Sequence, residues 1–445
     1  MADEFEINVD EIKDLESAKA IIKILLRRIK ILEEEVAQLK RNSSTSSKPP
    51  SSDIVKPPSE RRQPGVRKSG GQLGHKGAKR ELLPPDKVDE TKRIACHCCP
   101  DCGGSVEHCP EKILRQQVYE LTKKPVIVIE YQREGGFCSH CKEIKYAPSP
   151  IGSEQQYGTK LQAFLAYLKG SMGASYSELE DLCQNVLNVK ITRGSICNLT
   201  MGISEKISGF HKKLASAVKK ARQLNIDETS WKESGKMNWA WLFCNQEFAY
   251  FSIENTRGAK SLKKRLGKDF DGAVTSDFYG AYNYLPKAKH QFCLAHLIRD
   301  IKFITTLPDR ITKKHGEKLL SFFKRIFDYL HQKKPPDALR KLKNRLLNFL
   351  TTLKPPKGCL RTLLKRINRH WHSLWRFIDE PALFHPTNNF AERNLRNLVR
   401  LRKVSQGSRS KAGNLWITRF SSLYQTAKIR RISPWNMLLI EVARG

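Results

Sequence analysis

Two aspartates stand where strand-like apolar segments run into polar sequence, and their chemistry suits metal binding. Asp227 follows Leu224–Ile226 in the stretch LNIDETSW, and Asp277 follows Ala273–Thr275 in GAVTSDFYGAY. We expect each aspartate to stand at the exit of its strand, so that neighbouring strands place the two carboxylates side by side. Two like charges at that separation are costly unless a cation neutralises them. Hard oxygen ligands of this kind favour Mg²⁺ or Mn²⁺.

A third oxygen ligand is expected from a helix in the stretch HPTNNFAERNLRNLVRLRKV. Asn388 or Asn389 can cap this helix, and Glu392 lies in its first turn. From Glu392 to Arg431 there are eleven lysines and arginines and no second acid, so Glu392 is a lone carboxylate among cations suited to phosphate. The alternative is a capping box, in which Glu392 bonds back to the cap and has no further role.

Cys293-x-x-His296, in the stretch CLAHLIRD, is another pair of side chains that can bind metal. It follows KHQF, which we expect to be a short strand. Two interpretations stay open. The pair is half of a metal site, or it is a core cysteine followed by a histidine that orients a neighbouring side chain.

Two C-x-x-C pairs predict a zinc-binding ribbon over residues 96–150. Thiolates in such a pair lie on one tight turn and can both reach one tetrahedral Zn²⁺. The segment KKPVIVIEYQRE between the pairs alternates as a strand does, which a ribbon needs. Cys96 and Cys98 are extra thiols, so either could replace one of the ligands, and ordinary reduced cysteines are the alternative. The four expected ligands are Cys99, Cys102, Cys138 and Cys141.

The charge balance predicts a polyanionic partner. The 445 residues include 80 Lys and Arg against 45 Asp and Glu, a formal net charge of +35. Nucleic acid is the first expectation, and an anionic membrane surface is the rival. The sequence has no apolar run of membrane-spanning length and begins with an acidic segment. We therefore expect no signal peptide, no anchor, no membrane partner and a cytoplasmic location. Without a secretion signal, the twelve cysteines favour metal binding over disulfides.

Residues 155–220 have helical periodicity and the spacing of a helix-turn-helix. We expect the turn near Asn188–Lys190 and the start of the second helix at Thr192. Many helical hairpins share this pattern, so packing without DNA contact is the alternative. The side chains expected to face a DNA groove are Arg193, Ser195 and Asn198.

The first 95 residues predict two further segments. Residues 1–41 carry an apolar a/d repeat over three and a half heptads, which predicts a coiled coil and self-association as a homodimer or higher oligomer. One amphipathic helix packed on the rest of the chain is the alternative. Residues 42–95 lack Phe, Tyr and Trp and are rich in Ser, Pro and basic residues, which predicts a flexible linker that follows phosphates. The a/d positions, here called the apolar seam, are Leu15, Ala18, Ile22, Leu25, Ile29, Leu32, Val36 and Leu39.

Several of these motifs occur together in one order: SGGQLGHKGAKR, CPDCGG, CSHC, IDETSW, SDFYGAY, CLAH and NNFAERNLR. In this register the chain resembles the transposases of the bacterial insertion sequence family sixty-six, a DDE transposase family, from about residue 15 to the C-terminus. The resemblance implies a ribonuclease-H-like catalytic core with Asp227, Asp277 and Glu392 as the DDE triad, and Glu228 as the weaker acid. Leu73 departs from the family's glycine-rich segment, where proline is expected.

The predicted fold is therefore a multidomain α/β chain with a ribonuclease-H-like mixed sheet. Residues 309–379 hold nineteen lysines and arginines, and we expect them to form a helical insertion that contacts DNA. The expected segments are 1–41 coiled coil, 42–95 basic linker, 96–150 zinc ribbon, 155–220 helix-turn-helix-like, 221–308 first part of the core, 309–379 insertion, 380–432 second part of the core, and 433–445 C-terminal helix.

The function expected from the resemblance is metal-dependent DNA strand cleavage and strand transfer at insertion-sequence ends. Such phosphoryl transfer needs positioning and charge neutralisation rather than a covalent protein nucleophile. The expected partners are terminal inverted repeats, target DNA and accessory proteins of the same element. The alternatives are a non-enzymatic DNA-binding regulator derived from a transposase, and a hydrolytic nuclease. The side chains expected to hold the DNA backbone near the metals are Arg393, Arg396, Arg400, Arg402 and Lys403.

Overall fold

The chain divides into two compact units in the computed structural model. One unit comprises residues 1–57 and 132–445, and the other comprises residues 58–131. Each unit is described by itself below. The structure describes residues 14–42, 45, 82–92, 94, 101–105, 114–119, 121–122, 124–140, 142–148, 156–286, 289–354 and 358–444.

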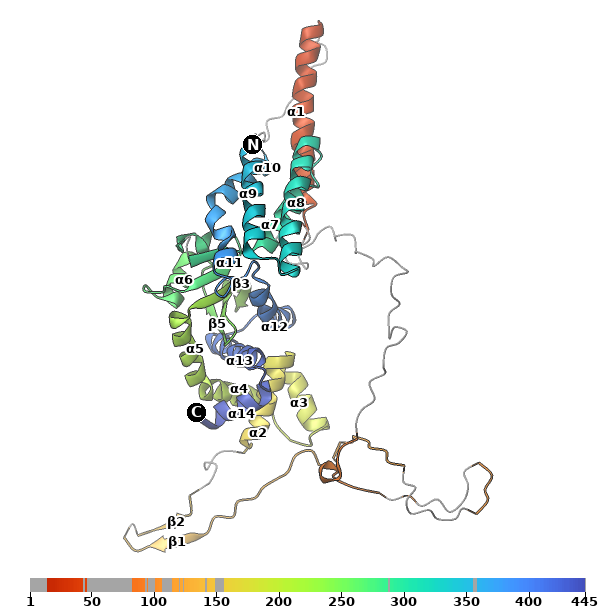
Figure 1. Cartoon of the computed structure of the whole chain (residues 1–445). Helices are drawn as coiled ribbons and strands as arrows, with labels where there is room; N and C mark the ends of the chain where they lie inside the picture. Colours follow the sequence, from red (N-terminus) through yellow and green to blue (C-terminus); the bar gives the residue numbers. More distant parts are fainter. Residues whose placement is uncertain are drawn as a thin grey trace. The chain divides into compact units, whose positions relative to one another are not determined.

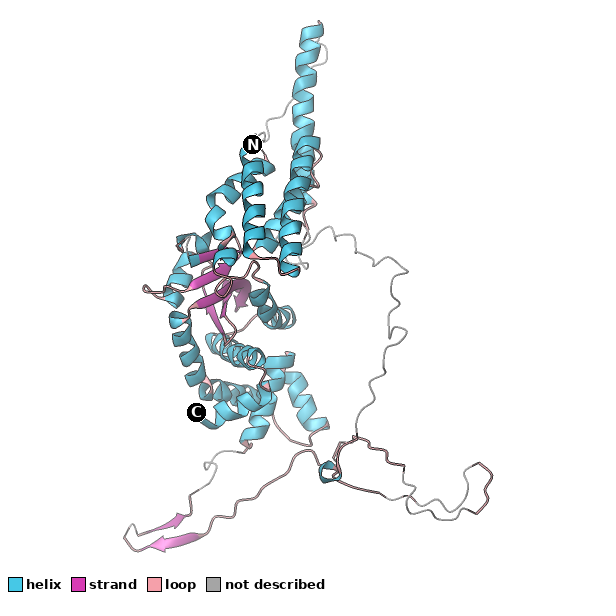
Figure 2. Cartoon of the chain, in the orientation of Figure 1, coloured by secondary structure: helices cyan, strands magenta, loops and turns pink. Residues whose placement is uncertain are grey.

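A mixed five-stranded sheet forms the centre of the larger unit, with helices around it (Figure 2). The spatial order of the strands is β5-β4-β3-β6-β7. The meander β3-β4-β5 is antiparallel, whereas β6 and β7 add to β3 in parallel. The mixed α/β class that the sequence predicts is confirmed. The strands are β3 (Gln223–Glu233), β4 (Lys236–Cys244), β5 (Ala249–Glu254), β6 (Ala273–Ser276) and β7 (His290–Phe292).

Strand β3 does not end at Asp227, and the expectation that this aspartate stands at its exit is wrong. The strand continues to Glu233 because β4 pairs with it antiparallel along that whole stretch. Its parallel neighbour β6 is shorter, and the last pair between them is Asn225 with Thr275. Asp227 therefore lies in mid-strand, just beyond the parallel part of the sheet.

Helices cover both faces of the sheet, and the alternation along β3 decides which residues meet them. Leu224 and Ile226 pack into a core with helices α5 (Ser208–Lys220) and α6 (Ala259–Leu266). Residues of the opposite parity, such as Trp231, face a second core that includes helix α12. Successive side chains of β3 thus enter different layers.

Helices α12 (Asn389–Ser405) and α13 (Lys411–Ile429) cover this second face and lie beside β3 and β5 (Figure 1). The predicted helix around Glu392 is confirmed, with Ala391 and Leu395 buried against the strands. The last helix is α14 (Pro434–Arg444), which packs on α13.

The segment before the sheet is helical, as predicted. It contains α2 (Thr159–Tyr167), one turn of wider helix, η4 (Leu168–Met172), and the pair α3 (Tyr176–Asn185) and α4 (Arg193–Lys206). Asn188, in the turn of this pair, has a φ of 54°, which asparagine tolerates better than most residues. The Thr192 side chain caps α4 by accepting a hydrogen bond from Ser195, so the expected turn and helix start are confirmed.

The helical insertion between the second aspartate and Glu392 is also confirmed in its secondary structure. It follows η5 (Gly280–Tyr284) and α7 (Leu294–Ile304) and shares one apolar core with α7 and the β6–β7 side of the sheet. Its elements are α8 (Arg310–His331), α9 (Pro336–Thr352), α10 (Cys359–Arg369), η7 (Trp371–Leu374) and α11 (Arg376–Asp379).

The N-terminal helix α1 (Leu15–Leu39) begins with a capping box between Asp14 and Ser17. One side of the helix contacts the insertion and α7: Lys30 pairs with Asp309 at 3.3 Å, and Arg41, just after the helix, pairs with Asp300 of α7 at 2.8 Å. The apolar seam points away from that side and stays largely exposed. Among the described residues, no helix combines the length and apolar character needed to cross a membrane.

Part of the expected zinc ribbon lies outside the described residues, namely 96–100, 106–113, 120, 123, 141 and 149–150. The strand expected over 123–134 is wrong for 124–134, which form no strand. Among the described residues no strand pairs with this segment, and its apolar side chains are exposed, for example Val128 (95% exposed). The strands are instead β1 (Gly135–Cys138) and β2 (Glu143–Tyr146), which pair as an antiparallel hairpin. In the smaller unit, η3 (Pro85–Lys87) is a single turn.

Candidate active site

The sheet register brings Asp227 and Asp277 together. Asn225 and Thr275 are paired across the parallel strands β3 and β6, and each aspartate comes two residues later. Equal steps along parallel strands keep side chains level and on the same face, at a strand spacing of about 4.8 Å. The backbone N–H of Glu228 donates to Asp227 Oδ1, and that of Tyr279 donates to Asp277 Oδ1, each at 2.9 Å. Backbone bonds therefore orient both carboxylates.

Glu392 reaches the same face because Asn388 fastens the start of α12 to β3. The Asn388 side chain is 1% exposed and donates to the Ile226 carbonyl at 2.8 Å, one residue before Asp227. Its own oxygen accepts a hydrogen bond from Asn225 at 3.0 Å. Asn388 occupies the N-cap position, but its side chain makes no cap bond. The sequence suggests that the polar side chain of Asn388 caps the helix. In the structure this side chain instead joins α12 to β3.

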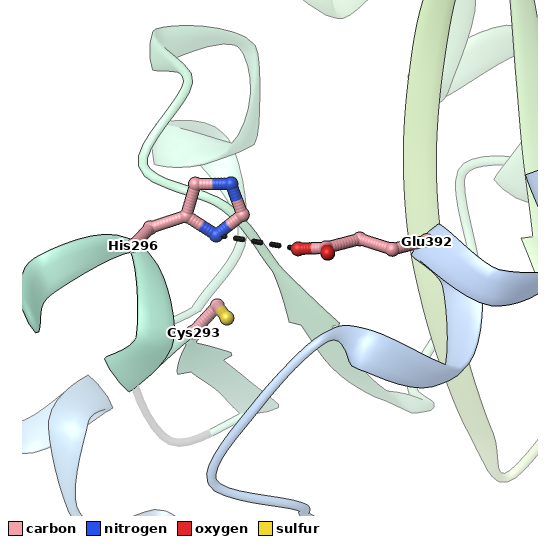
Figure 3. Close-up of side chains that lie close together, drawn as sticks. All are labelled: Cys293, His296 and Glu392. Atoms are coloured by element: carbon pink, nitrogen blue, oxygen red, sulfur yellow. Dashed lines mark ion pairs between the residues drawn. The ribbon is translucent and has the colours of Figure 1, made fainter. Parts of the chain in front are cut away.

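The capping-box interpretation of Glu392 is not what the structure contains. Its Oε1 is buried and has no hydrogen-bond partner among the described residues. The carboxylate extends towards His296 (Figure 3), with Oε1 3.7 Å from His296 Nδ1. Its Oε2 lies 3.8 Å from Arg299. Glu392 therefore projects into the site instead of bonding back to Asn389.

The neighbouring acids act electrostatically on Asp227. Burial raises the pKa of Asp227 well above its ordinary value, and the charges of Glu228, Asp277 and Glu392 raise it further, in that order. The hydrogen bond from the Glu228 backbone opposes this shift. A cation bound near Asp227 would relieve this repulsion. Oxygen donors of this charge suit a hard divalent cation, but the ligand atoms of Asp227, Asp277 and Glu392 do not all lie within 4.8 Å of one another in this structure.

Glu228 is held on the opposite face, with Leu224 and Ile226. It accepts hydrogen bonds from Tyr282 Oη at 2.6 Å and Arg257 Nε at 2.8 Å. Burial first, and then the charge of Asp277, raises the pKa of Glu228 to about 7, against the lowering effect of Tyr282 and Arg257. Sequence reasoning treated Glu228 as the weaker candidate and did not anticipate these two partners, which lie far from it along the chain.

Cys293 anchors the segment that leads into α12. Its Sγ accepts a hydrogen bond from the Asn388 backbone N–H at 3.1 Å, and the Leu294 N–H donates to the Pro386 carbonyl at 2.8 Å. Burial raises the pKa of the Cys293 thiol to about 11. Of the two open interpretations of this residue, the core cysteine fits these contacts.

His296 completes a compact group with Cys293 and Glu392. One potential ligand atom of each of these three residues lies within 4.8 Å of those of the other two (Figure 3). Among the described residues, no other set of three His, Cys, Asp or Glu residues meets this condition. Burial lowers the pKa of His296, whereas the charge of Asp277 raises it. His296 therefore lies within electrostatic reach of both the second aspartate and the glutamate.

A cavity of about 530 Å³ opens beside Glu392. Arg299, Arg393 and Arg396 line it together with His385. Cationic side chains around a metal-binding carboxylate suit a phosphate group. The structure thus brings two of the predicted DNA-binding residues to the site, and adds Arg299, which sequence reasoning missed although it follows His296 by one helical turn.

The other cations of α12 differ in their surroundings. Arg400 donates to the carbonyls of Ser171 and Met172, and Arg402 donates to Thr229 and Ser230. These bonds join α12 to η4 and to β3. Lys403 is exposed. DNA binding by these three residues stays a prediction, and two of them already have intramolecular partners.

The helical pair α3-α4 places its predicted DNA-binding residues at the start of α4. Arg193 pairs with Glu180 across the turn at 3.1 Å, while Asn198 is exposed. The Ser195 hydroxyl lies 3.0 Å from that of Thr192. Asn198 is thus accessible to solvent, whereas the Arg193 side chain already forms an ion pair with Glu180 of the preceding helix.

The zinc-ligand prediction stays a prediction, because most of the cysteines concerned lie outside the described residues. Cys96, Cys98, Cys99 and Cys141 lie outside the described residues. For Cys138 the backbone alone is described, as the end of β1. Cys102 is exposed and makes no disulfide.

Comparison with known families gives two matches. A family model described as "Transposase IS66 family" matches residues 154–414, and one described as "Family of unknown function (DUF6444)" matches residues 1–81. A search of curated proteins finds no match. The first match covers more than half of the chain and includes Asp227, Asp277 and Glu392. The chain therefore belongs to the IS66 family of transposases, enzymes that bind and process DNA.

Proposed function

We propose that this transposase is a DDE enzyme that cleaves and transfers DNA strands at insertion-sequence ends. Asp227, Asp277 and Glu392 are the acids that act on the scissile phosphate. The observation that carries the proposal is the pair of hydrogen bonds from Asn388 to β3, because they bring the glutamate helix to the face of the two aspartates. The sheet order β5-β4-β3-β6-β7 supports the ribonuclease-H-like core that the sequence resemblance implies.

Mg²⁺ or Mn²⁺ is the cofactor that the acids fit. Two observations support a bound cation here: Glu392 Oε1 makes no hydrogen bond among the described residues, and burial followed by neighbouring acids raises the pKa of Asp227. When bound, the divalent cations supply activation of a water or 3′-hydroxyl and stabilisation of the leaving oxygen. The protein itself positions the acids. Backbone hydrogen bonds orient the two aspartates, and Asn388 fixes where Glu392 lies relative to β3.

DNA enters beside Glu392 in this proposal. Arg299, Arg393 and Arg396 line the cavity there and neutralise the phosphates next to the bond that breaks. Lys403, Arg193, Asn198 and the basic insertion extend the contact with the duplex. For Arg400 and Arg402, the intramolecular bonds favour a role in holding α12, with DNA contact as a second role.

The N-terminal segments serve assembly and end recognition in the same proposal. The exposed apolar seam of α1 pairs with a second copy of the chain, because burying it against an identical seam removes its apolar surface from water. A Zn²⁺ held by Cys99, Cys102, Cys138 and Cys141 orders the ribbon. Terminal repeats, target DNA and accessory proteins of the element are the partners, and the cytoplasm is the location.

The proposal is tested with Asp227→Asn and a duplex that carries the DNA flanking the gene. In Mg²⁺, the variant should lose strand cleavage by at least about 10³-fold, with its affinity for the duplex nearly unchanged. Asp277→Asn and Glu392→Gln should behave alike. The matched control is Asp271→Asn, which neutralises a carboxylate that is 85% exposed near the start of β6. Cleavage retained by Asp227→Asn would refute the assignment.

Two further outcomes separate the alternatives. Duplex binding by the unmodified chain without any cleavage in Mg²⁺ or Mn²⁺ favours the non-enzymatic regulator. Cleavage without joining of the freed 3′ end to a target favours a hydrolytic nuclease on the same core. Salt dependence cannot choose among them, since all three would neutralise phosphates with the same cations.

A further inference from the structure

Two buried atoms in the candidate active site face one another without hydrogen bonds. His296 is 9% exposed and extends from the first turn of α7 towards α12 (Figure 3). Neither His296 Nδ1 nor Glu392 Oε1 has a hydrogen-bond partner among the described residues, although both atoms are buried. Buried polar atoms without partners cost about 1–3 kcal/mol each, so this arrangement calls for a ligand.

The separation of the two atoms suits a shared cation better than a hydrogen bond. His296 Nδ1 and Glu392 Oε1 are 3.7 Å apart, beyond hydrogen-bond length. Two ligands each about 2.1 Å from one cation are about 3.0 Å apart at a right angle and about 3.6 Å apart at 120°. A single ion between them would satisfy both atoms.

The neighbouring residues define which ligands are available. His296 Nδ1 lies 3.7 Å from Glu392 Oε1 within the group formed with Cys293. Cys293 Sγ already accepts the Asn388 N–H, which keeps the thiol in its anchoring role. The donors left for a cation are therefore one imidazole nitrogen and carboxylate oxygens.

We propose that His296 Nδ1 is a direct ligand of the cation held by Glu392. The inference rests on the proposed function and deepens it, because it names the class of metal. A nitrogen donor among oxygen ligands favours Mn²⁺ over Mg²⁺, since imidazole suits transition metals. The Glu392 position is thus a nitrogen-containing site that selects Mn²⁺, unlike a site built from carboxylates alone.

The test is pulsed electron paramagnetic resonance on the full chain loaded with Mn²⁺. The unmodified protein should show coupling of the Mn²⁺ electron spin to a directly bound nitrogen. His296→Gln should lose this coupling and bind Mn²⁺ at least about 10-fold more weakly, with a smaller loss for Mg²⁺. His385→Gln is the matched control, because His385 lines the cavity beside Glu392, and it should keep the nitrogen signal.

Two results would overturn the proposal: no nitrogen coupling in the unmodified protein with Mn²⁺ bound, or a coupling that survives in His296→Gln. The first needs no variant, so a folding defect in His296→Gln cannot hide it. Failure of the proposed function looks different, since Asp227→Asn would then still cleave DNA whatever the spectrum shows. Cleavage that requires all three acids, without nitrogen coupling, removes the His296 assignment alone.

Discussion

Asp227 and Glu228 are adjacent acids with different surroundings, and the alternation of a strand is the reason. Asp227 faces α12 and the other acids, whereas Glu228 faces α5 and α6 and is bound by Tyr282 and Arg257. The backbone N–H of Glu228 nevertheless donates to Asp227. Glu228 thus holds the strand from the opposite face, while Asp227 faces the proposed cation site.

The raised pKa of Glu228 predicts how stability depends on pH without metal. Its carboxyl has a pKa of about 7 in the folded chain, against 4.5 ordinarily. Between these values the unfolded chain has released the proton and the folded chain keeps it, so the free energy of unfolding falls as pH rises. The loss attributable to Glu228 is on the order of 3 kcal/mol. Asp227 shifts in the same direction and adds to it.

Urea unfolding at pH 5 and pH 8 in a chelator checks this prediction. Glu228→Gln cannot ionise and should lose clearly less stability between the two pH values than the unmodified chain. Asp271→Asn should follow the unmodified chain, because its carboxylate is exposed. An equal loss in Glu228→Gln would mean that another group carries the dependence.

Asn388 fastens the start of helix α12 to β3. Asn388→Ala removes the bonds to Ile226 and Asn225 and leaves a buried carbonyl and a buried amide without partners. We expect a loss of about 1–3 kcal/mol in the free energy of unfolding. We also expect cleavage to fall by about 100-fold, because a small misplacement of Glu392 costs that much.

Asn394→Ala is the matched control on the same helix. Its side chain bonds only the Phe390 carbonyl, one turn back, and not β3. Its effect on stability should stay within about 0.5 kcal/mol, with cleavage retained. Denaturant titration and the cleavage assay measure both, and similar effects of the two substitutions would show that Asn388 does not position α12.

The strongly periodic elements were predictable from the sequence, and the contacts between elements were not. The strands β3–β7, the turn at Asn188 and the helix around Glu392 follow from local pattern. The continuation of β3 beyond Asp227 depends on β4, and no strand among the described residues pairs with 124–134. The bonds of Asn388, Arg400 and Arg402 reach distant segments, so helix position alone could not reveal them.

At the scale of the molecule, α1 has two faces with different roles. Lys30 and Gln38 lie on the side that contacts the insertion, while the apolar seam lies on the other side, with Leu25 and Leu32 42% and 44% exposed. The double variant Leu25→Asn, Leu32→Asn should therefore convert a dimer into a monomer in sedimentation experiments.

Leu26→Asn with Ile31→Asn is the matched control for the seam. Both side chains are exposed on the same helix but lie outside the a/d positions. This control should stay dimeric. If the Leu25→Asn, Leu32→Asn variant stays dimeric, self-association lies elsewhere in the chain. The same follows if the seam variant and the control variant both become monomeric.

The insertion that separates Asp277 from Glu392 also sets the order in which a ribosome assembles the site. Translation passes both aspartates long before it reaches α12 and α13, which cover the sheet and deliver the glutamate. A polypeptide released before Asn389 has the aspartates but neither the third acid nor the helices that seal that face. On the proposed function, only a molecule synthesised past α12 and α13 can break DNA, so products that stop earlier do not damage the genome.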